Sequence, residues 1–297
     1  MQTIGIDIGG TKIAAALYDA AWQVIDETRA ATPDDYPVLL KTLQQITAPW
    51  QQGKVEVAIG VASAGLFHPV TGLATAANLP ISGQPFAADL ARCFGGPVAL
   101  LNDARAFALA EALHGAGRGA TQLLGITLGT GIGGGVVTGG RLAPSPNGVG
   151  GEVGHMPAPA DVIRAKGLPL SVCGCGQTGC VETFLAGPGL SRLAAFVLGR
   201  SLSPEQVLAD RHGDCAAVWE IWSDLAGAWL HGLLLALDPE VIVLGGSLGR
   251  RTEVAEAFAG AMASRQFAGF PVPEIRIGTT AETLGAALAA RARAADA

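Results

Sequence analysis

The chain opens on Thr3-Ile4-Gly5-Ile6-Asp7-Ile8-Gly9-Gly10-Thr11-Lys12, followed by the apolar run Ile13–Leu17. Thr3–Ile8 alternates and is rich in β-branched residues, and a glycine pair separates it from the second run. This pattern predicts a β-hairpin, with Trp22–Thr28 as a third strand. A helix is expected over Asp34–Trp50 and another over Ala104–His114, with short buried strands at Val55–Val61 and Pro97–Leu101.

The same pattern restarts in the second half. Gln122–Leu128 and Gly134–Thr138 predict a second strand pair with a glycine-rich bend, followed by a turn at Gly139-Gly140. After a loop-rich middle we expect a helix, a strand, a helix, a strand and a final helix, at Ala216–Leu237, Val241–Leu244, Glu253–Ala263, Glu274–Ile277 and Ala281–Ala294. The repetition predicts two related α/β lobes, residues 1–118 and 119–280, and the ligands of such open sheets lie beyond the carboxyl ends of strands.

Composition removes several classes of protein. The chain has 297 residues, 42 of them glycine, a net charge of −6 and 49% hydrophobic residues. The glycines have no three-residue period, which excludes collagen, and the apolar content excludes a disordered chain. No basic run suited to nucleic acid is present. A signal peptide and a membrane helix are not expected, because charged residues interrupt the N-terminus and the long uncharged segment Gly119–Gly140 holds nine glycines.

Three glycine clusters are candidates for nucleotide binding. The first lies in the first hairpin and consists of Asp7, Gly9, Gly10, Thr11 and Lys12. The backbone N–H groups of the glycine pair could approach an anion closely, and the polar side chains of the other three residues flank the pair. It joins two strands and so differs from a Walker A loop and from a Rossmann fingerprint. The alternative is a plain type I′ hairpin.

The second cluster is Gly129-Thr130-Gly131-Ile132-Gly133-Gly134-Gly135, directly after a predicted strand. It is interpreted as a second phosphate-binding loop, with a tight turn or bulge as the alternative. The third, Gly245-Gly246, could let a base or ribose lie against the chain, although strand–helix turns use glycine routinely.

Asn102-Asp103 stands between a predicted strand and a predicted helix. Capping of the helix explains most such pairs. The functional alternative makes Asp103 a general base that accepts a hydroxyl proton.

One imidazole and three thiols predict a metal site. His155, Cys173, Cys175 and Cys180 form a set suited to tetrahedral Zn²⁺, and four protein ligands make a closed, structural site. A disulfide is the alternative, but an odd total of five cysteines fits a reducing cytoplasm better. Glu152 and Glu182 flank this segment, either as surface charges or as groups that recognise hydroxyls.

Together these motifs resemble the ROK family of sugar kinases and repressors, within the actin-like ATPase superfamily. The resemblance spans almost the whole chain and rests on Asp7–Lys12, Asn102-Asp103, Gly129–Gly135, Glu152–His155, the cysteine loop and Gly245-Gly246. It implies two actin-like, ribonuclease-H-like lobes around a central cleft, the first completed by residues 281–297, with a zinc-binding loop in the second lobe. It also implies ATP with Mg²⁺, a hexose phosphorylated on its 6-hydroxyl, and a homodimer. The cytoplasmic location is expected from the cysteines and from the N-terminus, which does not have the pattern of a signal peptide.

The resemblance also assigns roles to residues. Asp103 would be the base, Asp7 would hold Mg²⁺ through water, and His155 would ligate the structural Zn²⁺. The phosphate contacts would be Asp7, Gly9, Gly10, Thr11, Lys12, Gly129, Thr130, Gly131, Gly133, Gly134, Gly245 and Gly246. The sugar contacts would be Ser63, Asn78, Asn102, Asp103, Glu152, His155 and Glu182.

Within the family the chain looks most like the bacterial N-acetyl-D-glucosamine kinases. It shares with them the 17-residue spacer between His155 and Cys173, Ala76–Pro80 and Ser82–Pro85. It departs from the usual Gly-x-Pro-Gly turn, since it has Ala62-Ser63-Ala64-Gly65. We expect N-acetyl-D-glucosamine to be converted to its 6-phosphate, with a glucokinase, a fructokinase or an N-acetylmannosamine kinase as alternatives. A sugar-responsive repressor is disfavoured, because the chain begins at the hairpin with no DNA-binding domain before it.

Overall fold

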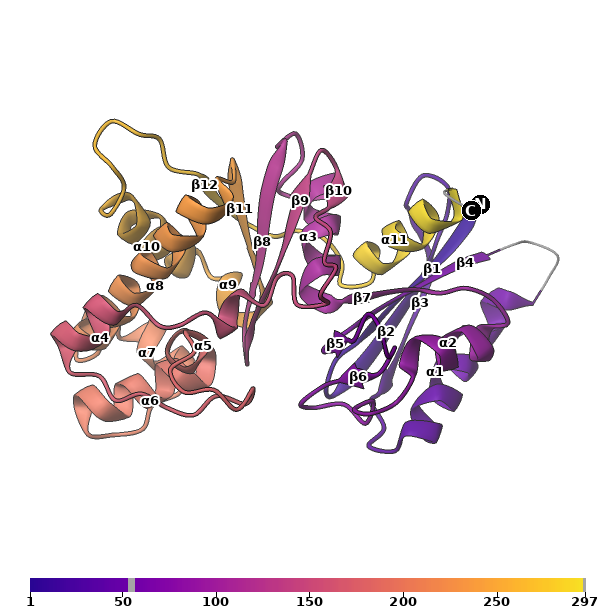
Figure 1. The fold of residues 1–297 in the computed structure, drawn as a ribbon, viewed down its shortest axis with the longest axis horizontal. Coiled ribbons are helices and arrows are strands. Elements are labelled where there is room, and N and C mark those ends of the chain that lie inside the picture. The colour runs from indigo at the N-terminus through magenta and orange to yellow at the C-terminus, as the bar shows by residue number, and fades with distance from the viewer. Residues whose placement is uncertain (53–56, 296–297) are drawn as a thin grey trace.

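Two five-stranded sheets with the same arrangement organise the computed structural model, which describes residues 1–52 and 57–295 (Figure 1). The first sheet has the order β3 (Val24–Ala31), β2 (Lys12–Tyr18), β1 (Gln2–Ile8), β4 (Val57–Ser63) and β7 (Ala99–Asn102). The second has the order β10 (Arg141–Leu142), β9 (Ile132–Thr138), β8 (Gln122–Leu128), β11 (Val241–Gly245) and β12 (Glu274–Ile277).

The two sheets repeat one pairing scheme. β1 is antiparallel to β2 and parallel to β4, just as β8 is antiparallel to β9 and parallel to β11. The predicted hairpins and the predicted repetition of an α/β fold are therefore confirmed. Two expected segments lie partly outside the described residues: the strand Val55–Val61 at its start, and the range 281–297 at its end.

Helices α1 (Tyr36–Gln51) and α2 (Phe86–Phe94) cover one face of the first sheet. α1 begins after Asp35, whose side chain accepts a hydrogen bond from Val38 N at 3.0 Å. A short β-hairpin, β5 (Leu66–Phe67) and β6 (Ala74–Thr75), follows β4. The core between helices and sheet is aliphatic and aromatic, and includes Ile4, Ile6, Leu39, Leu43, Phe86 and Leu90.

Where the chain passes from one sheet to the other, the helix that follows one sheet packs on the other sheet. This happens twice. α3 (Asp103–His114) follows β7 of the first sheet but packs on β8 and β9 of the second. α11 (Leu284–Ala295) follows β12 of the second sheet but packs on β1 and β4 of the first, and it contacts α3. Asp103 therefore stands at a crossing between the lobes.

The middle of the chain is more helical than expected. It holds the 3-10 turn η1 (Val153–His155) and the helices α4 (Ala160–Lys166), α5 (Glu182–Leu185), α6 (Gly187–Leu198) and α7 (Pro204–Ala209). The prediction of a loop-rich middle was wrong: Gly187-Pro188-Gly189, a composition typical of turns, opens helix α6. Proline is favourable in the first turn of a helix, and the buried Leu190 and Leu193 anchor α6 in the core of the second lobe.

The remaining helices follow the predictions more closely. α8 (Ala216–Leu237) and α10 (Thr252–Ala263) pack on each other around the fully buried Trp222, and α9 (Gly246–Gly249) is a single turn after β11. α11 begins at Leu284 rather than Ala281, after a turn in which Leu284 N donates to Ala281 O at 3.2 Å. Just before this turn the N–H groups of Thr279 and Thr280 bind the Glu111 carboxylate. Within residues 1–52 and 57–295, we find no helix with the length and apolar character that a membrane crossing requires.

Candidate functional site

The first glycine hairpin is a tight turn between β1 and β2. Gly9 N donates to Lys12 O at 2.9 Å, and Thr32 Oγ1 donates to Gly9 O at 2.7 Å from outside the hairpin. Asn78 lies against the turn, since a Cβ added at Gly10 would be 3.3 Å from the Asn78 Cβ. The turn is thus fixed by Thr32 on one side and flanked by a candidate sugar contact on the other.

The turn of the second hairpin is shorter than expected. It covers only Gly129–Gly131, because strand β9 already begins at Ile132. Gly133 and Gly135 lie in the strand, where α3 approaches closely. A Cβ at Gly133 would be 2.8 Å from that of Ala104, and one at Gly135 would be 2.8 Å from that of Ala108. The strand therefore begins two residues before the predicted Gly134 and shortens the predicted loop Gly129–Gly135, and Gly133 and Gly135 allow the helix that carries Asp103 to pack.

The third glycine pair ends β11. Gly246 has a φ of +79°, and a Cβ there would be 2.4 Å from Leu128 O. Both its backbone conformation and the neighbouring strand β8 therefore require glycine.

Asn102 caps α3, which leaves Asp103 available for another role. Asn102 Oδ1 accepts from Ala104 N at 2.9 Å, and its Nδ2 donates to Gly65 O at 3.2 Å. The capping interpretation thus applies to Asn102, which also fastens the turn that follows β4. Asp103 accepts from Ala104 N at 2.8 Å, and burial raises the pKa of its carboxyl.

Negative charge gathers beside the first hairpin. Burial, followed by the charges of Asp103 and Glu282, raises the pKa of Asp7 to about 7, while Lys12 acts in the opposite direction. Lys12 Nζ lies 2.8 Å from Glu282 Oε2. Glu282 was not predicted, because nothing near it in the sequence indicates that the chain returns to β1 there.

His155, Cys173, Cys175 and Cys180 come together as predicted, with their ligand atoms all within 4.8 Å of one another. Cys173 Sγ is 3.5 Å from His155 Nδ1, and Cys175 Sγ is 3.6 Å from Cys180 Sγ. Tetrahedral Zn²⁺, with bonds of about 2.3 Å to sulfur and about 2.0–2.1 Å to nitrogen, places ligand atoms about 3.5–3.8 Å apart. The cluster fits zinc, and all five cysteines are free thiols, which excludes the disulfide alternative in this structure.

Two glutamates face the imidazole of His155. Its Nε2 is 3.5 Å from Glu152 Oε2, and its Nδ1 is 3.7 Å from Glu182 Oε1. Burial raises the pKa of Glu152, the His155 charge lowers it, and the charges of Asp103 and Glu182 raise it further. The candidate sugar contacts of the second lobe therefore lie near one another and near Asp103.

Ser63 is the remaining predicted residue with an unusual environment. It ends β4, in register with Ile8 on one side and Asn102 on the other. Its hydroxyl is fully buried and has no hydrogen-bond partner among the described residues.

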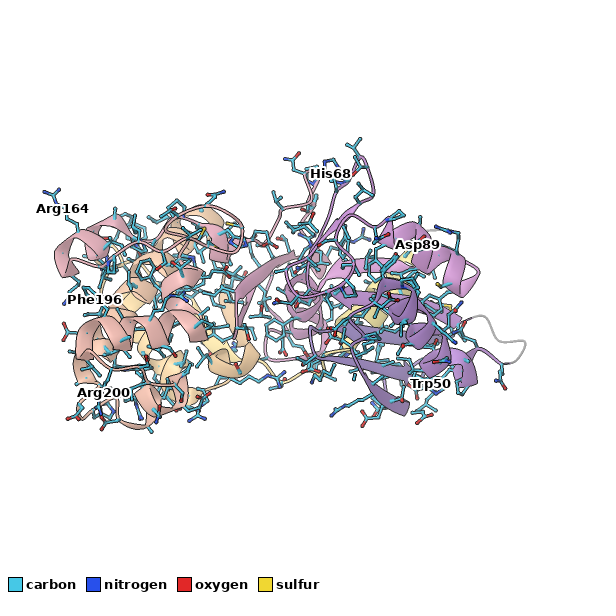
Figure 2. All side chains as sticks on the ribbon, turned by 90° about the horizontal axis from the view of Figure 1, so that it is seen from below. Trp50, His68, Asp89, Arg164, Phe196 and Arg200 are labelled. Atoms are coloured by element: carbon cyan, nitrogen blue, oxygen red, sulfur yellow. The ribbon has the colours of Figure 1, made fainter. Side chains whose placement is uncertain are left out.

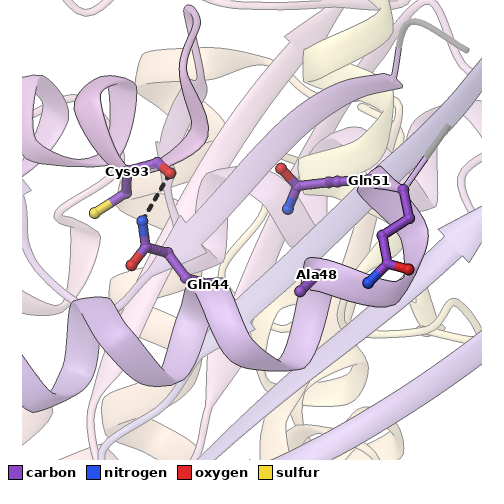
Figure 3. Close-up of a pocket in the computed structure, with 5 residues that line it drawn as sticks. Gln44, Ala48, Gln51 and Cys93 are labelled. Atoms are coloured by element: carbon purple, nitrogen blue, oxygen red, sulfur yellow. Dashed lines mark hydrogen bonds between the residues drawn. The ribbon is translucent and has the colours of Figure 1, made fainter. Parts of the chain in front are cut away.

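A separate pocket lies on the outer side of the first lobe (Figure 3). It is lined by Gln44, Ala48, Gln51, Gln52 and Cys93, and Gln44 Nε2 donates to Cys93 O at 2.9 Å. None of the predicted site residues lines it.

Comparison with known proteins agrees with this two-lobed architecture. Residues 3–293 match the ROK family. The chain is 38% identical over 293 residues to the N-acetylgalactosamine kinase AgaK of Shewanella sp., covering 96% of this chain and 95% of that protein. It is 39% identical over 255 residues to an N-acetyl-D-glucosamine kinase of Erwinia tasmaniensis, covering 82% and 83% of the two chains.

A crystal structure of a ROK hexokinase from Thermus thermophilus superposes with a TM-score of 0.87 at 33% identity, covering 100% of both chains. Fold and site thus define the class, a two-lobed protein with the sugar-kinase architecture of the actin-like ATPase fold. The chain belongs to the ROK family, which confirms the predicted family and fold.

Proposed function

We propose that this chain transfers a phosphoryl group from ATP to the 6-hydroxyl of an N-acetylhexosamine, and that the sugar is N-acetyl-D-glucosamine. One observation carries the proposal: the half-buried Asp103 carboxylate lies close enough to Asp7 and to Glu152 for its charge to raise the pKa of both. Asp7 precedes the first glycine hairpin and Glu152 precedes His155. A base between a phosphate side and a sugar side is what phosphoryl transfer to a hydroxyl requires.

The named relatives support the acetamido class of sugar. They are an N-acetylgalactosamine kinase at 38% identity and N-acetyl-D-glucosamine kinases at 34–39% identity. Both sugars carry an acetamido group on C2 and differ in configuration at C4. Glucose, fructose and N-acetylmannosamine remain alternatives to be tested, because the turn Ala62–Gly65 departs from the usual motif of the family.

In the proposed mechanism Asp103 orients the 6-hydroxyl and accepts its proton. The hydroxyl oxygen attacks the γ-phosphorus in line, and the bond from that phosphorus to the β,γ-bridging oxygen of ATP breaks. Burial strengthens the carboxylate as a base because it raises its pKa. Closure of the lobes would exclude water and so limit hydrolysis of ATP.

The surroundings of Asp7 suit a Mg²⁺·ATP complex. The carboxylates of Asp7, Asp103 and Glu282 repel one another, and a cation relieves that repulsion. Asp7 would hold Mg²⁺ through water, and the ion would neutralise phosphate charge. The proposed phosphate contacts are Gly9, Gly10, Thr11, Lys12, Gly129, Thr130 and Gly131, with Gly245 and Gly246 beside the nucleoside. Gly133 and Gly134 lie within β9 and are not among them.

The sugar side is supported by a set of polar side chains, of which the Ser63 hydroxyl has no partner among the described residues. The orphaned Ser63 hydroxyl, Asn78, Asn102, Glu152, His155 and Glu182 would contact the sugar. Zn²⁺ would hold His155 through Nδ1, the nitrogen nearer Cys173, and leave Nε2 toward Glu152. With four protein ligands the metal would orient this wall of the pocket and would not take part in the chemistry.

An ADP-release assay with a panel of sugars tests the proposal. The panel holds N-acetylglucosamine, N-acetylgalactosamine, N-acetylmannosamine, glucose and fructose, and NMR identifies the phosphorylated position. We expect the highest kcat/KM with N-acetylglucosamine and a 6-phosphate product. Sugar binding without ADP release would contradict a kinase and favour a sugar-responsive regulator.

Substitution of the proposed base tests its role, with a second Asp→Asn variant as the matched control. Asp103→Asn should lower kcat about 10²–10⁴-fold while the sugar Kd changes little. Asp161→Asn, at an exposed aspartate of α4 that pairs with Arg265, is the control and should keep wild-type turnover. Phosphorylation by Asp103→Asn at a near-wild-type rate would refute the assignment.

We further propose that the protein is a cytoplasmic homodimer with one Zn²⁺ per chain. The odd number of cysteines, three of which belong to the proposed zinc site, supports a reducing compartment. Light scattering measures the oligomeric state, metal analysis the zinc content, and cell fractionation the location.

A further inference from the structure

Arg105 follows Asp103 by two residues on α3, and its guanidinium is half-buried. It forms no salt bridge with the described part of the chain. Its Nη2 donates to Ala143 O at 2.8 Å and its Nη1 to Gly150 O at 3.2 Å. The two bonds fasten both ends of segment 143–150 to the helix that carries the proposed base.

Segment 143–150 leads directly into Glu152. Within it, Gly150 N donates to Ser145 Oγ at 2.8 Å and Gly148 N donates to Ser145 O at 3.0 Å. Glu152 N in turn donates to Val149 O at 3.3 Å. The bond from Arg105 to Gly150 therefore holds the backbone two residues before the Glu152 carboxylate.

The other side of the segment touches the first lobe. A Cβ added at Gly148 would lie 2.9 Å from Phe67 O and 3.2 Å from Pro69 Cδ. Both belong to the β5–β6 hairpin, which projects where the lobes meet and carries His68 (Figure 2). Segment 143–150 is thus held by α3 and braced by the first lobe.

We infer that Arg105 is a positioning residue: it fixes segment 143–150 to α3 and so sets the position of Glu152 relative to Asp103, which determines the affinity for the sugar. The inference rests on the proposed function, in which Glu152 contacts the sugar. The planar guanidinium can serve two carbonyl oxygens at once, whereas the compact ammonium of lysine is a single point of contact.

Hydrogen exchange tests the clamp without reference to activity. In Arg105→Met, the amides of Ala143, Ser145 and residues 147–151 should exchange at least about 10-fold faster, while those of the Gly129–Gly131 turn keep their wild-type rates. Arg105→Lys should give an intermediate effect and serves if the methionine variant does not fold. Unchanged exchange in segment 143–151 would overturn the clamp.

Steady-state kinetics test the consequence for the sugar. Arg105→Met should raise the KM for the sugar about 10-fold, with kcat within about 3-fold of wild type and the KM for ATP unchanged. Arg211→Lys is the control, since Arg211 donates to a single carbonyl, that of Leu208 at 2.9 Å, outside the site. An unchanged sugar KM, or equal losses in kcat and in both KM values, would overturn the inference. A wild-type protein that phosphorylates no sugar would instead refute the proposed function.

Discussion

Glu182 joins the metal cluster to the second glycine hairpin. Its Oε2 accepts a hydrogen bond from Ile132 N at 3.1 Å, and its Oε1 lies 3.0 Å from Cys173 Sγ. Ile132 is the first residue of β9, directly after the turn Gly129–Gly131. A disturbance of the metal loop should therefore reach the proposed phosphate contacts as well as the sugar pocket.

Loss of one zinc ligand should remove zinc from the protein and lower its stability. In Cys175→Ser we expect less than one tenth of the wild-type zinc and a free energy of unfolding lower by several kcal/mol, roughly a 10 °C fall in Tm, because the ion contributes directly to folding. Metal analysis and thermal denaturation measure the two effects. Cys93→Ser is the control, since Cys93 lies in the other lobe (Figure 3). Full zinc content in Cys175→Ser would exclude this ligand set.

The stability of the nucleotide-free protein should depend on the titration of Asp7. Its pKa is raised from 3.8 to about 7, so between these values the folded protein holds a proton that the unfolded chain has released. The contribution of this group to stability is thus present at acid pH and is lost as the pH rises through about 7.

Asp7→Asn removes that titration. We expect the variant to have a higher Tm than the wild type above about pH 7, with a difference that shrinks as the pH falls toward about 4. Thermal denaturation over this range measures the effect, with the exposed Asp34→Asn as the control. A constant difference across the range would show that Asp7 keeps an ordinary pKa.

Glu111 should be essential for stability. Its side chain is fully buried and binds the crossing from β12 to α11, with Oε1 accepting from Thr279 N at 2.8 Å and Thr280 N at 2.7 Å. Oε2 accepts from Ala116 N at 2.8 Å. Glu111→Ala leaves these donors unpaired, and we expect a loss of at least about 3 kcal/mol by urea unfolding. The exposed Glu256→Ala should change stability by less than about 0.5 kcal/mol. Similar losses in the two variants would contradict this role.

Much of the fold was predictable because it depends on local periodicity. The alternation in Thr3–Ile8 and the apolar run Gln122–Leu128 identify the central strand of each sheet, and Ala216–Leu237 coincides with α8. Glycine was less informative. Gly133 and Gly135 serve the packing of α3, and a glycine required by a neighbouring helix looks the same in sequence as one required by a turn.

The candidate site was predictable where its residues follow strands or share a cysteine motif. Arg105, Glu111 and Glu282 were missed because their partners are distant in sequence. Arg105 binds carbonyl groups 38 and 45 residues away, and Glu111 binds Thr280, 169 residues away. Local patterns do not contain such pairings, which arise only when the chain crosses between the lobes.

Lys12 and Glu282 form an ion pair that should compete with ATP. Their side chains are 49% and 45% exposed, with Nζ and Oε2 2.8 Å apart. Exposed pairs contribute only about 0–1 kcal/mol, so Lys12 can exchange the carboxylate for a phosphate at little cost. Glu282→Gln removes the competing acceptor and a negative charge near the phosphates. We expect the KM for ATP to fall about 2–5-fold in this variant, and to rise about 10-fold in Lys12→Met.

The control for this effect is a second exposed pair, Lys166–Glu220, whose Nζ and Oε1 are 3.2 Å apart in the other lobe. Glu220→Gln should leave the KM for ATP unchanged. Because salt screens exposed charges, the difference between Glu282→Gln and the wild type should shrink as ionic strength rises from about 0.01 M to about 1 M. A higher KM for ATP in Glu282→Gln would instead mean that Glu282 holds Lys12 in its phosphate-binding position, and competition between carboxylate and phosphate would be refuted.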